Sequence, residues 1–189
     1  MCSYGSPVRR GGCPSIVVGM DTRALLTDAF HRLPPLVRQH AEGADDHLLH
    51  TRLDPEANPL AWLLWHTVRI QDVQVAELAG REQVWTAEGW VDRFGLPLDP
   101  ADHGYGHDRE QVASVRVEDP GLLADYQDAV TAMTDAYVAT ADPDELARVV
   151  DPSYDPPVTA GVRLVSILDD AFQHLGQAGY LRGHLERSR

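Results

Sequence analysis

The chain has 189 residues, of which 43% are hydrophobic, and a formal net charge of −13. Its length is that of one domain with a sizeable core, and its negative charge argues against general binding to nucleic acid or anionic membrane surfaces. All 16 basic residues are arginine, which excludes Schiff-base lysine chemistry and a P-loop lysine, and the two cysteines are too few for a disulfide framework or a cysteine-based zinc site.

The first 19 residues differ from the rest, because they are rich in Gly, Pro and Ser and lack periodicity. We interpret residues 1–19 as a disordered leader, or as sequence upstream of a true start at Met20. The apolar segment after Arg9 and Arg10 is too short for a signal peptide, and no apolar run reaches the roughly 18 residues of a membrane helix. We therefore expect a cytoplasmic protein whose domain spans residues 20–189.

The first half of the domain has helical periodicity. A helix is expected over about 21–39, where Pro34 and Pro35 kink or divide it. Residues 44–57 are polar and predict a connector with at most a short turn. The next helix is expected to begin with Asn58 as N-cap and Pro59 at its first position, and to end at Gly80. The face of the 21–39 helix expected to point inward carries Leu25, Leu26, Ala29, Phe30 and Leu33.

The second half predicts two more long helices. Residues 81–118 are too many for a tight turn and predict one or two short helices with a structured loop. Helices are expected over about 119–137, with Asp119 as N-cap, over 144–150, and over 159–185, with a loop at 151–157; no strand is predicted. Four long helices with a long crossover between the second and third indicate an all-α four-helix bundle. The last helix is expected to bury Val162, Val165, Leu168, Ala171, Phe172 and Leu175.

Three residues in apolar stretches suggest a metal site. Asp170 and His174 are four residues apart, so they share one face of the last helix. A buried carboxylate needs a cation or strong donors nearby, which a divalent metal would provide. His66 lies in another apolar helical run, and with Asp170 and His174 it would complete a three-ligand site with open positions, as catalytic metals have.

Two segments resemble the DinB-like (damage-inducible) superfamily. The segment Asn58–Asp72, with His66 at its centre, resembles the second helix of that superfamily, and Asp170–Gln177 resembles the fourth. The resemblance covers about 20–182 and implies an up-down-down-up bundle with a divalent metal held by His66, Asp170 and His174. Many members have His where this chain has Asp170, whereas the N-terminal domains of mycothiol-dependent maleylpyruvate isomerases have a carboxylate, usually Glu.

The resemblance also implies a chemistry. Several members look like thiol S-transferases or thiol-dependent isomerases, in which a Lewis-acidic metal can hold a low-molecular-weight thiol as thiolate. We expect Zn or Ni, with Fe or Mn as alternatives, and a small electrophile as substrate. Mycothiol is favoured over bacillithiol because the arginine-rich, lysine-free composition resembles that of high-GC actinobacterial proteins. A homodimer is expected because members of the superfamily commonly look dimeric.

Two other functions stay open at this point. The metal could activate water in a hydrolase, or the bundle could be a non-enzymatic, stress-related binding protein. Six further residues are candidates for supporting the ligands or contacting the substrate. They are Gln71, Asp72, Gln177 and Arg163 on the helices, and His103 and His107 in a Gly-rich loop that could cover the site.

Overall fold

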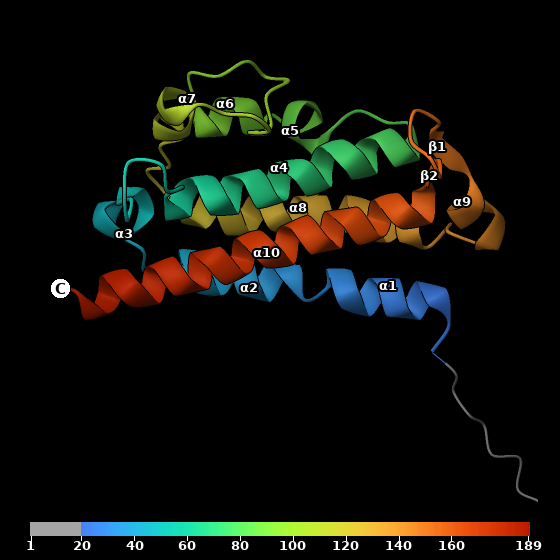
Figure 1. Cartoon of the computed structure of the whole chain (residues 1–189), viewed down its shortest axis with the longest axis horizontal. Helices are drawn as coiled ribbons and strands as arrows, with labels where there is room; N and C mark the ends of the chain where they lie inside the picture. The colour runs from blue at the N-terminus through green and yellow to red at the C-terminus, as the bar shows by residue number, and fades with distance from the viewer. Residues whose placement is uncertain (1–19) are drawn as a thin grey trace, which may run out of the picture.

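The computed structural model describes residues 20–189, so the interpretation of residues 1–19 lies outside the described residues. The described part is mostly helical, which confirms the all-α class (Figure 1). The helix α10 packs against α4 and α2, and α8 packs against the same two helices, so four rods surround one core. The up-down-down-up order stays a prediction. These rods are α1 (Thr22–Phe30) with α2 (Leu33–Ala41), α4 (Leu60–Ala79), α8 (Gly121–Val138) and α10 (Ala160–Arg187).

The first rod consists of two helices, because the helix is interrupted between Phe30 and Leu33, just before Pro34 and Pro35. Proline is tolerated in the first turn of a helix but not in its interior, so the pair begins α2 instead of continuing α1. Phe30 and Leu33 are buried as predicted, whereas Leu25 is exposed, so its predicted inward position is wrong.

Two predicted helix starts shift by one residue. Pro59, with extended ψ of 163°, is the N-cap of α4, so Asn58 lies outside the helix and does not cap it. Pro120 is likewise the N-cap of α8, although the Asp119 side chain still accepts a hydrogen bond from the Gly121 N–H at 2.8 Å. The predicted end of α4 is confirmed, because Gly80 adopts the left-handed conformation that terminates helices.

Short elements fill the connections. The connector before α4 contains α3 (Asp46–His50), and the long crossover contains α5 (Val84–Ala87), α6 (Trp90–Phe94) and α7 (Arg109–Ser114), which lie along one side of the bundle (Figure 1). After α9 (Pro143–Ala147), β1 (Val149–Asp151) pairs antiparallel with β2 (Val158–Thr159). The helix predicted over 144–150 is therefore too long, and the prediction that no strand forms is wrong. This hairpin forms because two short segments rich in β-branched residues pair with each other. The pattern of apolar and polar residues within either segment alone does not predict that pairing.

The orientation of α10 corrects the prediction most relevant to function. Its buried face consists of Ala160, Leu164, Ile167, Ala171, Leu175, Ala178, Leu181 and Leu185. Val162, Val165 and Phe172 are exposed, because α10 has apolar residues at helical spacing on more than one face. Asp170 and His174 consequently lie at the edge of the buried face. No helix among residues 20–189 is long and apolar enough to cross a membrane.

Candidate metal centre

The three predicted ligands come together between α4 and α10. His66 from α4 and Asp170 and His174 from α10 each offer a ligand atom, and these atoms lie within 4.8 Å of one another. His174 Nε2 lies 3.5 Å from Asp170 Oδ1, and the rings of His66 and His174 stand nearly perpendicular with centroids 4.9 Å apart. One helical turn separates Asp170 from His174, which places both on the side of α10 that faces His66.

A backbone carbonyl fixes the orientation of His66. Its Nδ1 lies 2.6 Å from the carbonyl oxygen of His103, and because a carbonyl can only accept, Nδ1 carries the proton and donates. This tautomer leaves Nε2 with a free lone pair. Trp62 stacks on the imidazole with ring centroids 4.5 Å apart and an angle of 14° between the ring planes, so the position and the rotation of the imidazole are both fixed. Such support of a histidine ligand is typical of metal sites.

The loop that supplies this carbonyl requires glycine at position 104. Gly104 has φ of +95°, and a Cβ atom there would lie only 2.6 Å from His66 Nδ1. Asp102 stabilises the loop by accepting a hydrogen bond from the Gly104 N–H at 3.0 Å. The guanidinium of Arg69, which is fully buried, donates to the Asp102 carbonyl at 3.0 Å. The loop is therefore tied to α4 on the far side of His66 from α10.

The side chains of His103 and His107 do not belong to the candidate ligand set of His66, Asp170 and His174. His107 Nδ1 accepts a hydrogen bond from Trp62 Nε1 at 3.1 Å, so its protonated Nε2 donates to Asp102 Oδ1 at 2.8 Å. His107 therefore supports the tryptophan that stacks on His66, while His103 acts through its carbonyl group. The loop contacts the Nδ1 side of His66, and its predicted role as a cover for the site stays a prediction.

Asp170 and His174 have the polar contacts that a cation would complete. His174 Nδ1 lies 3.1 Å from Gln177 Oε1 and donates to it, which leaves Nε2 directed at Asp170. Asp170 Oδ2 is buried and has no hydrogen-bond partner among residues 20–189. A buried carboxylate oxygen without a donor is costly and needs an explanation. Two imidazole nitrogens and an oxygen of this carboxylate form a donor set that a divalent metal would satisfy.

The electrostatics of the two histidines differ. Burial lowers the pKa of His66 to about 4, so this ring is neutral near pH 7 and its Nε2 can act as a ligand. The hydrogen bond to the Asp170 carboxylate raises the pKa of His174. A cation at the centre would replace the proton on His174 as the partner of that carboxylate.

Three other candidates lie away from the ligands. Gln71 donates to Thr134 Oγ1 at 2.8 Å and joins a buried polar network between α4 and α8. Asp72 accepts hydrogen bonds from the backbone N–H groups at the start of α5 and from a buried tyrosine on α8. Arg163 pairs with Glu77 at 3.1 Å. These residues hold helices together and do not support the metal ligands directly.

Sequence reasoning did not identify Trp62, Gly104 or Arg69 as parts of this site. The stacking role of Trp62 has a signal in its spacing, since it precedes His66 by one helical turn. Arg69 has a weaker signal, because a basic residue in an otherwise apolar helical run needs buried partners. For Gly104 the sequence offers only the Gly-rich composition of the loop.

The superfamily profile described as "DinB superfamily" matches residues 29–178. The chain belongs to the DinB superfamily. A crystal structure described as that of "the conserved protein of locus from Enterococcus faecalis" is similar to this member, with 32% sequence identity and a TM-score of 0.82. The similarity covers 90% of this chain and 100% of that one. Among proteins with curated descriptions, none matches this DinB superfamily member.

Proposed function

We propose that this DinB superfamily member binds one divalent metal through His66, Asp170 and His174 and uses it as a thiol S-transferase or thiol-dependent isomerase. The observation that carries the metal is the Asp170 carboxylate, whose buried Oδ2 has no hydrogen-bond partner within residues 20–189 and which offers an oxygen within 4.8 Å of an imidazole nitrogen of His66 and of His174. Zn or Ni suits this donor set best, and Fe or Mn are alternatives.

The chain itself would position the reaction. The His103 carbonyl and Trp62 hold His66, and Gln177 holds His174, so both rings stay aligned with their Nε2 atoms free of these contacts. A divalent metal bound there would supply a Lewis acid that lowers the pKa of a thiol in an open position.

Residues 20–189 contain no cysteine, so in the described part of the chain the proposal takes the nucleophilic sulfur from a second substrate. A low-molecular-weight thiol of the mycothiol kind fits this need. The thiol loses its proton to solvent, its sulfur forms a bond to an electrophilic carbon, and the leaving group departs with the electron pair of the broken bond. In an isomerase the thiol would add to the electrophilic carbon of the substrate and would later be expelled unchanged. A homodimer and a cytoplasmic location remain predictions.

The test uses the metal-loaded protein, a panel of small thiols and the electrophile 1-chloro-2,4-dinitrobenzene. We expect formation of the thioether to require both the thiol and the metal, and to be lost in His174→Ala. Cleavage of p-nitrophenyl acetate without any thiol would instead support the hydrolase. A protein that takes up no Zn or Ni would leave the non-enzymatic binding protein as the better explanation.

A further inference from the structure

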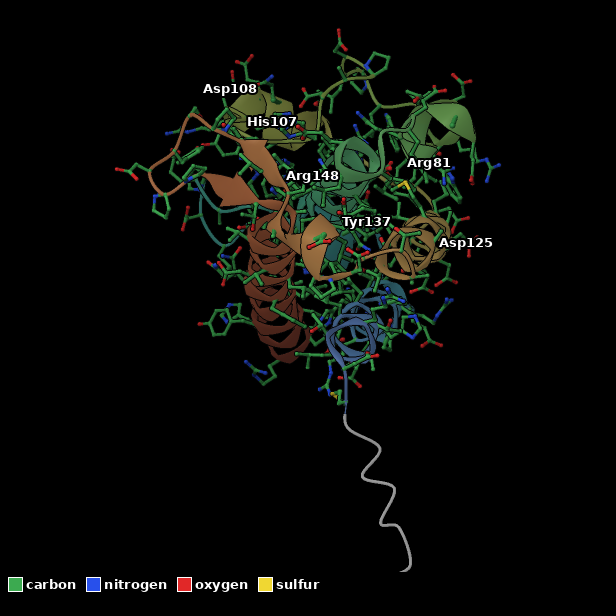
Figure 2. All side chains as sticks on the ribbon, turned by 90° about the vertical axis from the view of Figure 1, so that its right-hand side faces the viewer. Arg81, His107, Asp108, Asp125, Tyr137 and Arg148 are labelled. Carbon is green, nitrogen blue, oxygen red and sulfur yellow. The ribbon has the colours of Figure 1, made fainter. Side chains whose placement is uncertain are left out.

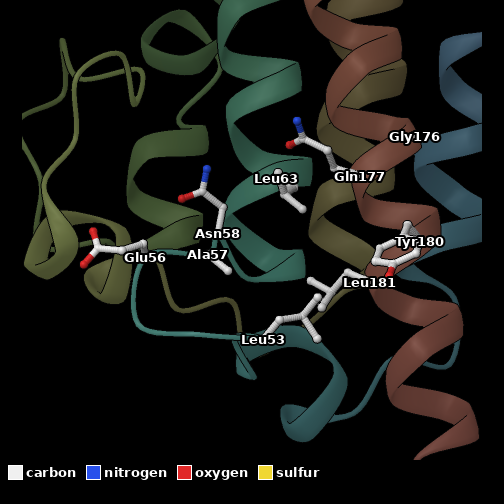
Figure 3. Close-up of a pocket in the computed structure, with 9 residues that line it drawn as sticks. All are labelled: Leu53, Glu56, Ala57, Asn58, Leu63, Gly176, Gln177, Tyr180 and Leu181. Carbon is white, nitrogen blue, oxygen red and sulfur yellow. The ribbon is translucent and has the colours of Figure 1, made fainter.

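A pocket of about 560 Å³ lies beside the metal centre, between the segment that precedes α4 and the second half of α10 (Figure 3). Its walls include Leu53 and Ala57 from that segment, Leu63 from α4, and Leu181 from α10. Its volume falls in the range of small-molecule sites, which are mostly apolar with a few polar groups.

The pocket adjoins the ligands through two residues. Leu63 lies three residues before His66 on α4, so the two share one face of the helix. Gln177 lines the pocket and also accepts the hydrogen bond from His174 Nδ1. The pocket therefore begins one helical turn from the metal ligands. A molecule whose reactive end reaches the metal would place its remaining part here.

The charges around the pocket select against anions. Glu56 is the one charged side chain that lines it among the described residues, and its carboxylate is paired with Arg109. Two arginines of α10 are engaged elsewhere, because Arg163 pairs with Glu77 and Arg182 donates to three backbone carbonyls of residues 39–42, and the third, Arg187, does not line the pocket. An anionic group in the pocket would lose water without gaining a cationic partner.

Besides Glu56, the polar side chains of the wall are neutral, namely two amides and the hydroxyl of Tyr180. Asn58 lines the pocket at the start of α4, and Gln177, whose Oε1 is occupied by His174, keeps its NH₂ group as a donor. Amides can hydrogen-bond an uncharged carbonyl or hydroxyl at little cost in desolvation.

We propose that this pocket binds the uncharged, largely apolar end of the substrate and excludes anionic substrates such as dicarboxylates. The role as a substrate pocket rests on the proposed function of the metal centre. The selectivity for neutral, apolar groups rests on the pocket residues alone, so the two can be tested separately.

Two dyes that differ by one sulfonate test this proposal. N-phenyl-1-naphthylamine is neutral, and 8-anilinonaphthalene-1-sulfonate carries the same rings with a negative charge. We expect the neutral dye to bind with a fluorescence increase at one site per chain, and the anionic dye to bind about tenfold more weakly or worse, since its charge lacks a partner. Each titration is run with metal-free and with Zn-loaded protein.

Gly176→Leu locates the dye. A Cβ atom at Gly176 would meet nothing within 4 Å, so the leucine can fill the pocket without displacing the backbone. Gly183→Leu is the matched control on the same helix, because Gly183 does not line the pocket and its Cβ would meet only the flexible end of Arg187. We expect Gly176→Leu to abolish binding of the neutral dye and Gly183→Leu to retain it, with the metal content of both unchanged.

The outcomes separate the two proposals. Equal affinity for both dyes, or neutral-dye binding that survives Gly176→Leu, would overturn the pocket proposal whatever the metal content. Selective dye binding that Gly176→Leu removes would support the pocket. If the parent then took up no metal, the proposed function would fail while the selectivity of the pocket stood.

Discussion

Gly104→Ala is expected to weaken metal binding although residue 104 is not a ligand. The new Cβ atom would lie 2.6 Å from His66 Nδ1, which is shorter than normal contacts allow, and 3.2 Å from Trp65 Cζ3, which is a tight contact. The loop must therefore retreat, which lengthens the 2.6 Å hydrogen bond between the His103 carbonyl and His66. His66 would then lose its fixed tautomer and orientation. Loss of such support typically lowers metal affinity about 10- to 100-fold, which corresponds to about 1.4 to 2.8 kcal/mol.

Gly106→Ala is the matched control for this experiment. Gly106 also has positive φ, +75°, so alanine there suffers similar backbone strain, but its Cβ would meet nothing within 4 Å. Competition with a chromophoric chelator measures the Zn affinity of both variants and of the parent. We expect Gly106→Ala to bind Zn as the parent does and Gly104→Ala to bind it more weakly. Equal affinities in the two variants would refute the claim that the loop positions His66.

Three further predictions test the surrounding structure. Tyr126→Phe removes a buried hydroxyl that donates to Asp72 at 2.6 Å, so urea unfolding should show that the free energy of unfolding falls by about 1–3 kcal/mol. An unchanged urea midpoint would contradict a stabilising role for this hydrogen bond. At the end of the bundle shown in Figure 2, Arg148 holds the pKa of Glu145 at about 2, below its usual value, so this pair stabilises the fold near neutral pH and the contribution is lost as pH falls toward 2. Arg148→Met should therefore cost about 1 kcal/mol at pH 7, after allowance for solvent screening, and its stability difference from the parent should narrow as the pH falls from about 5 to about 2. A difference that stays constant over this range would exclude this ion pair as its source. Excess Zn should raise the melting temperature of the parent and leave that of His174→Ala unchanged, and an equal rise in both would place the metal elsewhere.

The sequence predicted the parts of the site that depend on local geometry. Asp170 and His174 share a helix face because their spacing is one turn, and that relation holds wherever the helix packs. The approach of His66 to this pair depends on which helices face each other, and it was expected from the apolar helical run around His66 and from the resemblance rather than from spacing. The structure brings the three together as expected.

The remaining features arise from contacts between distant segments. Gly104 is required by its approach to His66, which no local pattern encodes. The burial of α10 was misjudged because Val165 and Phe172 continue an apolar pattern that lies beside the true inner face of Leu164, Ile167 and their neighbours. The hairpin after α9 likewise required pairing of two separate segments. Periodicity identifies elements, but several faces of one helix can satisfy it.

The most direct test of the metal centre is the metal content of Asp170→Asn, measured by plasma mass spectrometry beside Asp169→Asn. Both changes remove one negative charge from α10 at adjacent positions, but Asp169 is exposed and accepts a hydrogen bond from Gln173, whereas Asp170 faces the two histidines. The account predicts about one equivalent of divalent metal per chain in the parent and in Asp169→Asn, and a loss of most of it in Asp170→Asn. Equal metal in the two variants, or none in the parent after incubation with Zn and Ni, would contradict a metal site built from His66, Asp170 and His174.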